Sequence, residues 1–296
     1  MELKNRRTVR SKFASSIRLI RPANSIMVGF AVIVGIGVAS HNIVQIFSPV
    51  ALLGFLTGFA ISSFSMISND IYDIEVDRVN QPGRPLVIGE TSVKTASFLA
   101  ISYLVIGLLT AGILGFLTFS IAGVFAFIGW FYNYYAKRLG LLGNSLVALS
   151  VAIPFIYGSV SISNLILNLT YPLAFTSFLA GLGREVLKGI SDIVGDKIRN
   201  IKSVAVVHGS VYARRLTSAI FLIAVVSSSI PVILGMLGHS LWVYIILIFI
   251  PDAIFLFLSV RVVSMSLDSE AFKLKGIALA GMLAGLLAYL VAGLSY

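Results

Sequence analysis

The chain has 296 residues, of which 58% are hydrophobic and only 11% are charged. Soluble globular domains carry about 25% charged residues, so this composition excludes a water-soluble protein and indicates a polytopic membrane protein. There is no cysteine, which excludes disulfides, thiolate metal ligands and cysteine nucleophiles. A net charge of +10 would suggest nucleic-acid binding in a soluble protein, but a membrane offers a different explanation, and we expect no nucleic-acid partner.

Apolar runs divide the chain into candidate membrane-spanning helices. A hydrocarbon core about 30 Å thick requires about 20 apolar residues per helix. Nine runs satisfy this requirement, and they cover residues 24–40, 48–70, 93–115, 117–136, 144–163, 171–190, 213–236, 240–262 and 273–294. The sequence therefore predicts an all-α bundle of nine transmembrane helices. We expect a single membrane domain over residues 1–296, with a basic cytoplasmic segment at residues 1–20.

The basic residues are confined to alternate connections between these runs. All 22 Lys and Arg lie at the N-terminus, or in and beside the connections that follow the second, fourth, sixth and eighth runs. The connections at 40–49 and 161–170 contain none. Short cytoplasmic loops collect Lys and Arg. We therefore expect a multi-pass protein of the cell membrane with its N-terminus and charged loops in the cytoplasm and its C-terminus outside.

A short internal repeat links the two halves of the chain. Residues 73–80 (DIEVDRVN) resemble residues 192–198 (DIVGDKI), which begin 119 residues later. Both stretches follow an even-numbered span, and both precede a loop that reaches a glycine, Gly89 or Gly209. The repeat predicts two related four-helix halves followed by a ninth helix.

The end of the second predicted helix concentrates oxygen-bearing side chains on one face. At about 100° per residue, four of them share about a quarter of the helix surface: Asn69, Asp70, Asp73 and Asp77. Like charges on one face repel unless cations lie between them, and Mg²⁺ prefers carboxylate oxygens that it shares with substrate phosphates. These residues are candidate metal ligands. The alternative is a solvated helix end whose acids balance nearby Lys and Arg.

A second acidic face follows at the end of the sixth predicted helix. Four residues fall within an arc of about 80°: Glu185, Lys188, Asp192 and Asp196. Two such faces could hold two or more Mg²⁺ ions around one diphosphate. Asp192 and Asp196 are therefore candidate metal ligands too. The candidate catalytic groups of both faces are Asp73, Asp77, Asp192 and Asp196, together with Lys137.

Basic and polar residues on the same side could bind an anionic substrate. Arg78 and Arg84 lie in a loop whose two prolines and one glycine predict a fixed turn, and guanidinium groups bind phosphate bidentately. Tyr157 lies inside the fifth predicted helix, where it could line a cavity. The further candidates lie near the ends of predicted helices: Arg21, Asn24, Tyr132, Asn133, Lys137 and Lys188. The alternatives are a positive-inside loop for the arginines, an aromatic belt for the tyrosines and core packing for Tyr157. Asp252 lies inside a predicted span and has no assigned role.

Together these motifs resemble the UbiA superfamily of intramembrane prenyltransferases, over nearly the whole chain. The resemblance rests on Asn69-Asp70-x-x-Asp73-x-x-x-Asp77, the following Arg84-Pro85, and Asp192-x-x-x-Asp196. It implies an Mg²⁺-dependent transfer of a prenyl group from an allylic diphosphate inside an apolar bundle. It also implies that Asn69 and the aspartates hold the metal, with Asp70 nearby, while Arg84, Lys137 and Lys188 stabilise the leaving diphosphate.

Within the superfamily, residues 69–89 and 183–197 are most similar to the archaeal digeranylgeranylglyceryl phosphate synthases. This implies geranylgeranyl diphosphate as donor and geranylgeranylglyceryl phosphate as acceptor, and Arg21 is a candidate for the acceptor phosphate. Asn133 departs from the pattern, because related enzymes often carry Tyr four residues before Lys137; Tyr132 is a candidate substitute. Two alternatives stay open: prenylation of an aromatic acceptor, and a membrane transporter. Transporter sites lie near the membrane midplane, whereas these charges lie at one interface.

Overall fold

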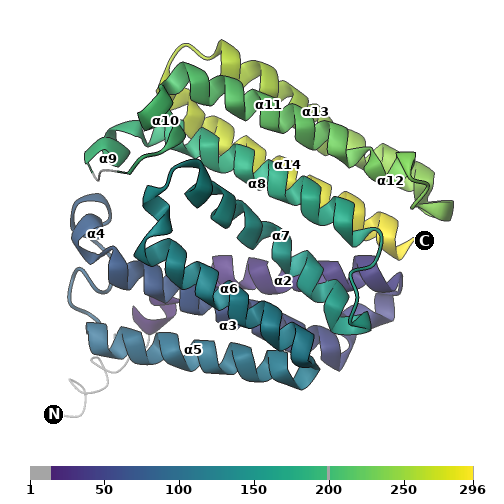
Figure 1. The fold of residues 1–296 in the computed structure, drawn as a ribbon, viewed down its shortest axis with the longest axis horizontal. Coiled ribbons are helices and arrows are strands. Elements are labelled where there is room, and N and C mark those ends of the chain that lie inside the picture. The colour runs from purple at the N-terminus through teal and green to yellow at the C-terminus, as the bar shows by residue number, and fades with distance from the viewer. Residues whose placement is uncertain (1–14, 199–200, 296) are drawn as a thin grey trace, which may run out of the picture. The chain divides into compact units, whose positions relative to one another are not determined.

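The computed structural model describes residues 15–198 and 201–295, and every regular element in this part of the chain is a helix (Figure 1). The long helices are α2 (Pro22–Ser40), α3 (Pro49–Tyr72), α5 (Val93–Leu114), α6 (Phe116–Tyr134), α7 (Leu141–Ser163), α8 (Thr170–Ser191), α11 (Ser210–Ser228), α13 (Leu241–Ser264) and α14 (Ala271–Leu294). The short ones are α4 (Ile74–Asn80), α9 (Ile193–Ile198), α10 (Val204–His208) and α12 (Ile230–Ile233). Residues 15–19 are also helical, and residues 1–14 of the expected basic segment lie outside the described residues.

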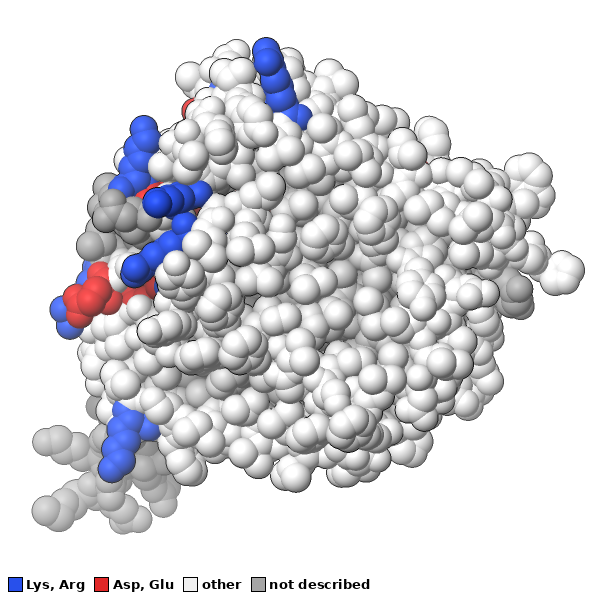
Figure 2. Space-filling view, in the orientation of Figure 1, with Lys and Arg blue, Asp and Glu red and all other residues white. Residues whose placement is uncertain are grey.

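Eight segments of the described chain are long and apolar enough to cross a membrane. They comprise every long helix except α8, with α11 continuing through α12. The all-α, multi-pass membrane fold is thus confirmed. One expected span is missing from these eight. It is the sixth in chain order, at 171–190, which does form a helix, α8. The greater part of the face drawn in Figure 2 carries no charged side chain, as expected for a surface in contact with lipid.

Helix α8 differs from the other long helices because its last two turns are charged. Arg184, Glu185 and Lys188 lower its average hydropathy. The helix is nevertheless rich in fully buried residues, and it packs against α7, α11 and α14 (Figure 1). A helix surrounded by other helices contacts little lipid, so it tolerates polar residues that a peripheral span would not.

The described residues fall into two compact units. Unit 1 comprises residues 15–30 and 52–134 of the described chain, and unit 2 comprises residues 31–51 and the described residues from 135 onward. The boundary after residue 134 coincides with the end of the fourth predicted span. Residues 31–40 of α2 belong to unit 2, because Val34 and Val38 lie in one buried cluster with Phe155, Tyr289 and Ala292.

The core of unit 1 is formed by α3, α5 and α6 with the start of the described chain. Leu19, Phe64, Ile67, Ala96 and Ala126 belong to one buried cluster. The small residues allow the helices to approach closely, which is the usual mode of helix packing in membranes. This packing fixes the C-terminal ends of α3 and α6 relative to the residues that precede α2.

The core of unit 2 is formed chiefly by α8, α11, α13 and α14. Leu187, Phe221, Leu258 and Ala278 come from these four helices and are fully buried in one cluster. The span expected at 213–236 is interrupted: α11 ends at Ser228 and α12 begins at Ile230. Pro231 explains the break, because proline has no N–H to donate to the preceding turn.

Candidate functional site

The first acidic motif begins at a break between α3 and α4. Asp73 is the single residue between the two helices, with φ −100° and ψ 10°. The amide of Asp73 still donates to the Asn69 carbonyl at 2.9 Å, and the amide of Asp77 donates to the Asp73 carbonyl at 2.7 Å. The one-turn spacing of Asn69, Asp73 and Asp77 that the sequence predicts is therefore retained through the break.

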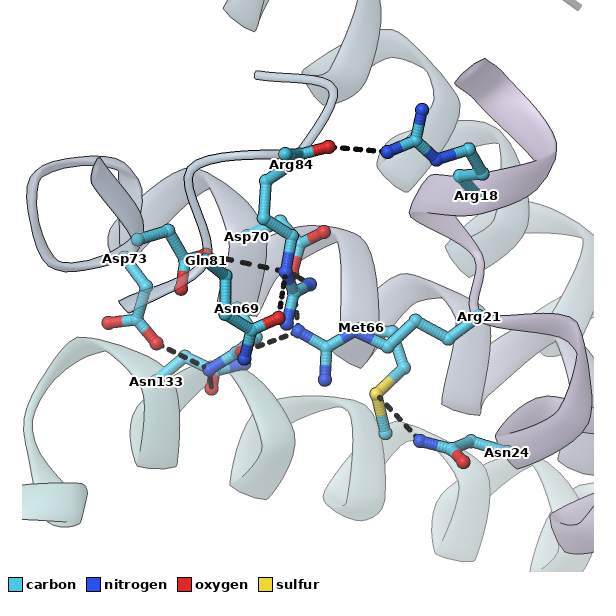
Figure 3. Close-up of polar contacts among 12 residues, drawn as sticks. Arg18, Arg21, Asn24, Met66, Asn69, Asp70, Asp73, Gln81, Arg84 and Asn133 are labelled. Atoms are coloured by element: carbon cyan, nitrogen blue, oxygen red, sulfur yellow. Dashed lines mark hydrogen bonds and ion pairs between the residues drawn. The ribbon is translucent and has the colours of Figure 1, made fainter. Parts of the chain in front are cut away.

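Asn69 is held by polar contacts on both sides of its amide group. Its Nδ2 donates to Asp73 Oδ2 at 2.9 Å and to Asn133 Oδ1 at 3.0 Å. Its Oδ1 accepts a hydrogen bond from Arg21 Nη2 at 3.0 Å. These contacts join α3, α6 and the residue that precedes α2 (Figure 3).

Asp70 is the most deeply buried acid of the motif, with 2% of its surface exposed. Its Oδ1 accepts hydrogen bonds from Arg21, at 2.5 Å, and from Arg84. Figure 3 shows the two guanidinium groups reaching this carboxylate from different segments of the chain. A buried charge is costly unless it is paired, so Asp70 and the two arginines hold one another in place.

Arg84 also connects Asp70 to Asp77. Its Nε donates to Gln81 Oε1 at 2.8 Å and lies 3.8 Å from Asp77 Oδ2. Burial raises the pKa of Asp77 above its usual 3.8, the carboxylates of Asp70 and Asp73 raise it further, and Arg84 opposes the shift. Acidic groups crowded in this way favour a cation between them.

The turn that carries Arg84 is tied to the segment before α2 by Arg18. Arg18 donates to the Gly83 carbonyl and, at 3.2 Å, to Glu90 Oε2. Nearby, Thr91 Oγ1 donates to Ser15 Oγ at 3.0 Å. No local pattern predicts these contacts, because the partners lie 65 or more residues apart in the chain.

The structure joins some of the other predicted residues of unit 1 to this cluster and not others. Asn133 is 2% exposed and contacts Asn69 directly. Asn24 lies nearby, with its Nδ2 3.9 Å from Met66 Sδ. Arg78 instead donates to Glu75 at 2.9 Å, and both side chains are exposed. Tyr132 is half-buried at the end of α6.

The second acidic motif lies in unit 2 and has the same local form. Asp192 is the single residue between α8 and α9, with φ −102° and ψ 6°, and the Asp196 amide donates to its carbonyl at 2.8 Å. Ser191 Oγ donates to Asp192 Oδ1 at 2.9 Å. The internal repeat found in the sequence is thus matched by equivalent backbone geometry.

Glu185 links the basic residues that precede this second motif. Its side chain is 10% exposed, and it accepts from Arg184 at 2.9 Å and from Lys188 Nζ at 3.4 Å. Lys188 therefore stays on the acidic face where the sequence predicted it. The two other predicted residues of unit 2 lie elsewhere in it: Lys137 in the short turn Ala136–Arg138, half-buried, and Tyr157 inside α7, 4% exposed.

The residues of the first motif suit a divalent cation that is shared with a substrate. In the described chain no group of three or more His, Cys, Asp or Glu side chains is arranged to hold a metal by itself. Mg²⁺ commonly takes only one or two protein carboxylates and completes its coordination with water and phosphate oxygens. Asn69, Asp73 and Asp77 lie one turn apart along the chain, and their amide and carboxylate oxygens are the hard donors of the motif. This set of hard oxygen donors fits Mg²⁺.

Asp252 has a local explanation within unit 2. Its Oδ2 accepts a hydrogen bond from Ser228 Oγ at 2.8 Å, and the Ser228 carbonyl accepts one from Tyr244 at 2.6 Å. Ser228 is the last residue of α11, where the helix is interrupted. These side chains therefore satisfy backbone and hydroxyl groups that the interruption exposes.

The profile of the UbiA prenyltransferase family matches residues 28–292. The chain belongs to this family. The digeranylgeranylglyceryl phosphate synthase of Archaeoglobus fulgidus is 33% identical over 274 residues, which cover 92% of each chain. The synthase of Saccharolobus solfataricus is 30% identical over 275 residues, covering 92% of this chain and 96% of the relative. This UbiA-family protein is accordingly a membrane prenyltransferase.

Solved structures agree with this assignment. A structure described as a digeranylgeranylglyceryl phosphate synthase in membranes has a TM-score of 0.82 and 27% identity, and the match covers 96% of this chain and 99% of that one. A UbiA homologue from Archaeoglobus fulgidus bound to GPP and Mg²⁺ has a TM-score of 0.66 and 21% identity, over 95% and 100% of the two chains. The second likeness establishes the fold alone.

Proposed function

We propose that this UbiA-family enzyme transfers a geranylgeranyl group from geranylgeranyl diphosphate to geranylgeranylglyceryl phosphate, in the synthesis of archaeal ether lipids. The observation that carries this choice of substrates is the 33% identity to the Archaeoglobus fulgidus synthase over 92% of both chains. The arginine-rich surroundings of the first acidic motif support it, because both proposed substrates are anionic.

We further propose that α8 also crosses the membrane, which brings the number of spans to nine. In this topology the N-terminus is cytoplasmic and the C-terminus is outside. This topology accounts for the separation of charges, because all Lys and Arg then lie on the cytoplasmic side and the loops at 41–48 and 164–169 contain none. Both acidic motifs then lie at the cytoplasmic ends of spans, where a water-soluble diphosphate group can reach them.

In this proposal Mg²⁺ is held by Asn69, Asp73 and Asp77 of the first motif and by Asp192 and Asp196 of the second. When bound, the metal neutralises the charge that develops on the leaving diphosphate. We assign Asp70 a different role from Asn69, Asp73 and Asp77. Because its Oδ1 already accepts from two arginines, its main role is to orient them.

The chain's own cations assist the departure of the diphosphate. Arg84 and Arg21, held on Asp70, and the two lysines Lys137 and Lys188 supply donors to its oxygens. Such preorganised donors stabilise charge that builds up in the transition state, each contributing a factor of about 10²–10³ in rate. The bond between C1 of the prenyl chain and the diphosphate oxygen then breaks, and an allylic cation forms.

Apolar helices protect the cation until the acceptor attacks. Water would quench it, so the nearly uncharged spans serve to exclude water from the reaction. The acceptor hydroxyl forms the new C–O bond and, as the bond completes, gives its proton to the released diphosphate. Because the cation is a strong electrophile, the hydroxyl needs no strong base for this step.

The proposal is tested by supplying membranes that contain the protein with radiolabelled geranylgeranyl diphosphate and a set of acceptors. We expect labelling of geranylgeranylglyceryl phosphate that requires Mg²⁺ and is lost with EDTA. Labelling of an aromatic acid instead would overturn the acceptor assignment while leaving the prenyl-transfer chemistry intact. Absence of diphosphate release with every acceptor would overturn both.

A further inference from the structure

Asn133 has an amide group whose orientation is fixed by a backbone carbonyl. Its Nδ2 lies 3.0 Å from the Ser65 carbonyl oxygen, which can only accept a hydrogen bond. The nitrogen of Asn133 must therefore face Ser65. Its Oδ1 is turned the other way, toward Asn69.

The orientation of Asn133 in turn determines that of Asn69. Because Asn133 turns its Oδ1 toward Asn69, the group of Asn69 that faces it must be the donor, Nδ2. Asn69 Nδ2 donates to Asn133 Oδ1 at 3.0 Å and to Asp73 Oδ2 at 2.9 Å. Both N–H bonds of Asn69 are then used. Its Oδ1 accepts from Arg21 at 3.0 Å and retains a second lone pair. Only in this orientation can Asn69 offer an oxygen to a divalent cation.

The packing of α6 on α3 explains why Asn133 reaches this position. A Cβ atom at Gly129 would lie 2.9 Å from Ser65 Oγ, so the helices approach closely at that glycine. Asn133 follows one turn later and is 2% exposed. A buried amide is costly unless it is hydrogen-bonded, and an apolar residue would fill this space at lower cost. Its two hydrogen bonds therefore indicate a role beyond packing.

We propose that Asn133 is a positioning residue that acts through Asn69: it holds the Asn69 amide with its oxygen available to the divalent cation. The proposal rests on the proposed function, in which Asn69 is a metal ligand, and deepens it. It also explains how an asparagine serves at a position where related enzymes often carry tyrosine. Residues that orient metal ligands typically contribute about 10- to 100-fold to metal affinity.

The experiment measures Mg²⁺ binding to the purified protein by titration calorimetry in the presence of inorganic pyrophosphate. Manganese binding, followed by electron paramagnetic resonance, gives a second readout that is independent of turnover. The variants are Asn133→Leu, Asn69→Ala and the double variant. Asn133→Ala removes the same two hydrogen bonds without adding methyl groups, and serves if the leucine variant does not fold. Thr118→Val is the matched control, because Thr118 is a fully buried polar residue of the same helix.

We expect Asn133→Leu and Asn69→Ala each to weaken Mg²⁺ binding about 10-fold or more. In the Asn69→Ala background, Asn133→Leu should have no further effect, because Asn69 is the residue through which it acts. Thr118→Val should lower only the melting temperature.

Two results would overturn the inference alone: a normal Mg²⁺ affinity in Asn133→Leu while Asn69→Ala weakens it, or effects of the two substitutions that multiply in the double variant. A normal affinity in both Asn69→Ala and Asp73→Ala would instead remove the proposed metal site, and the inference with it.

Discussion

Asp73 and Asp192 occupy equivalent positions in the two halves of the chain. Each is the only residue between a long helix and a short one, and their backbone angles agree to within a few degrees: φ −100° and ψ 10° for Asp73, φ −102° and ψ 6° for Asp192. In both motifs the aspartate four residues later donates its amide to this residue's carbonyl. A glycine with positive φ then precedes the next long helix in each half, Gly89 at 73° and Gly209 at 83°.

This equivalence predicts that the two aspartates contribute comparably to turnover. Replacing either Asp73 or Asp192 with alanine removes one carboxylate from the proposed metal site, and we expect turnover to fall about 10²- to 10³-fold. The measurement is release of diphosphate from geranylgeranyl diphosphate in the presence of acceptor. Glu75→Ala is the control, because Glu75 is exposed and, among the described residues, forms its ion pair with Arg78, which is also exposed. Full release by either aspartate variant would show that its motif is not part of the catalytic machinery.

Local sequence patterns predicted the positions of the helices and the one-turn spacing of the acidic residues, because both depend on residues close together in the chain. Runs of apolar residues located all nine long helices, and the four-residue spacing survives the break at Asp73. The composition of α8 differs from that of the other long helices, because α8 packs against α7, α11 and α14 and tolerates Arg184, Glu185 and Lys188 in its last two turns.

The contacts among side chains could not be predicted from the sequence, because they depend on packing between segments that are distant in the chain. Arg21 was predicted to bind a substrate, but its pairing with Asp70, 49 residues away, follows only from the packing of the first residues of α2 on α3. The same packing places Arg18 against Gly83. Asn133 was considered as a contact to diphosphate, and the structure directs it to Asn69 instead.

The absence of cysteine makes the proposed topology directly testable with single introduced cysteines. Leu165→Cys and Leu234→Cys lie at span ends that are expected outside, and Lys94→Cys, at the start of α5, and Lys202→Cys lie on the side that is expected inside. We expect a membrane-impermeant maleimide to label only the first pair in intact cells. Labelling at residue 202 and protection at 234 would mean that α8 does not cross the membrane, because removing one span reverses every later loop.

Arg18 is expected to affect substrate affinity without touching the substrate. It ties the turn that carries Arg84 to the segment before α2, through the Gly83 carbonyl and Glu90. Arg18→Ala frees this turn, so Arg84 spends less time on Asp70. Because the pairing with Glu90 is partly exposed, we expect a modest effect, a rise of about 3- to 10-fold in KM for the prenyl diphosphate with little change in kcat. Lys94→Ala, an exposed cation at the start of α5, should change neither. A fall in kcat at unchanged KM would argue against this role.

A substitution at Asp70 tests whether this residue anchors the two arginines or binds the metal. The side chain is buried, and its Oδ1 accepts from Arg21 and Arg84. Asp70→Asn keeps the volume but removes the counter-charge of Arg21 and leaves Arg84 with its longer contact to Asp77. Breaking a buried ion pair in this way costs about 3–5 kcal/mol, so we expect a clear loss of thermal stability. We also expect KM for the prenyl diphosphate to rise, because Arg84 is no longer held in position.

The concentration of Mg²⁺ that gives half-maximal activity should stay within about twofold of the wild-type value, whereas Asp73→Asn, if it retains measurable turnover, should raise it about 10-fold or more. An equal Mg²⁺ requirement in the two variants would instead place Asp70 among the metal ligands, with the arginine contacts secondary.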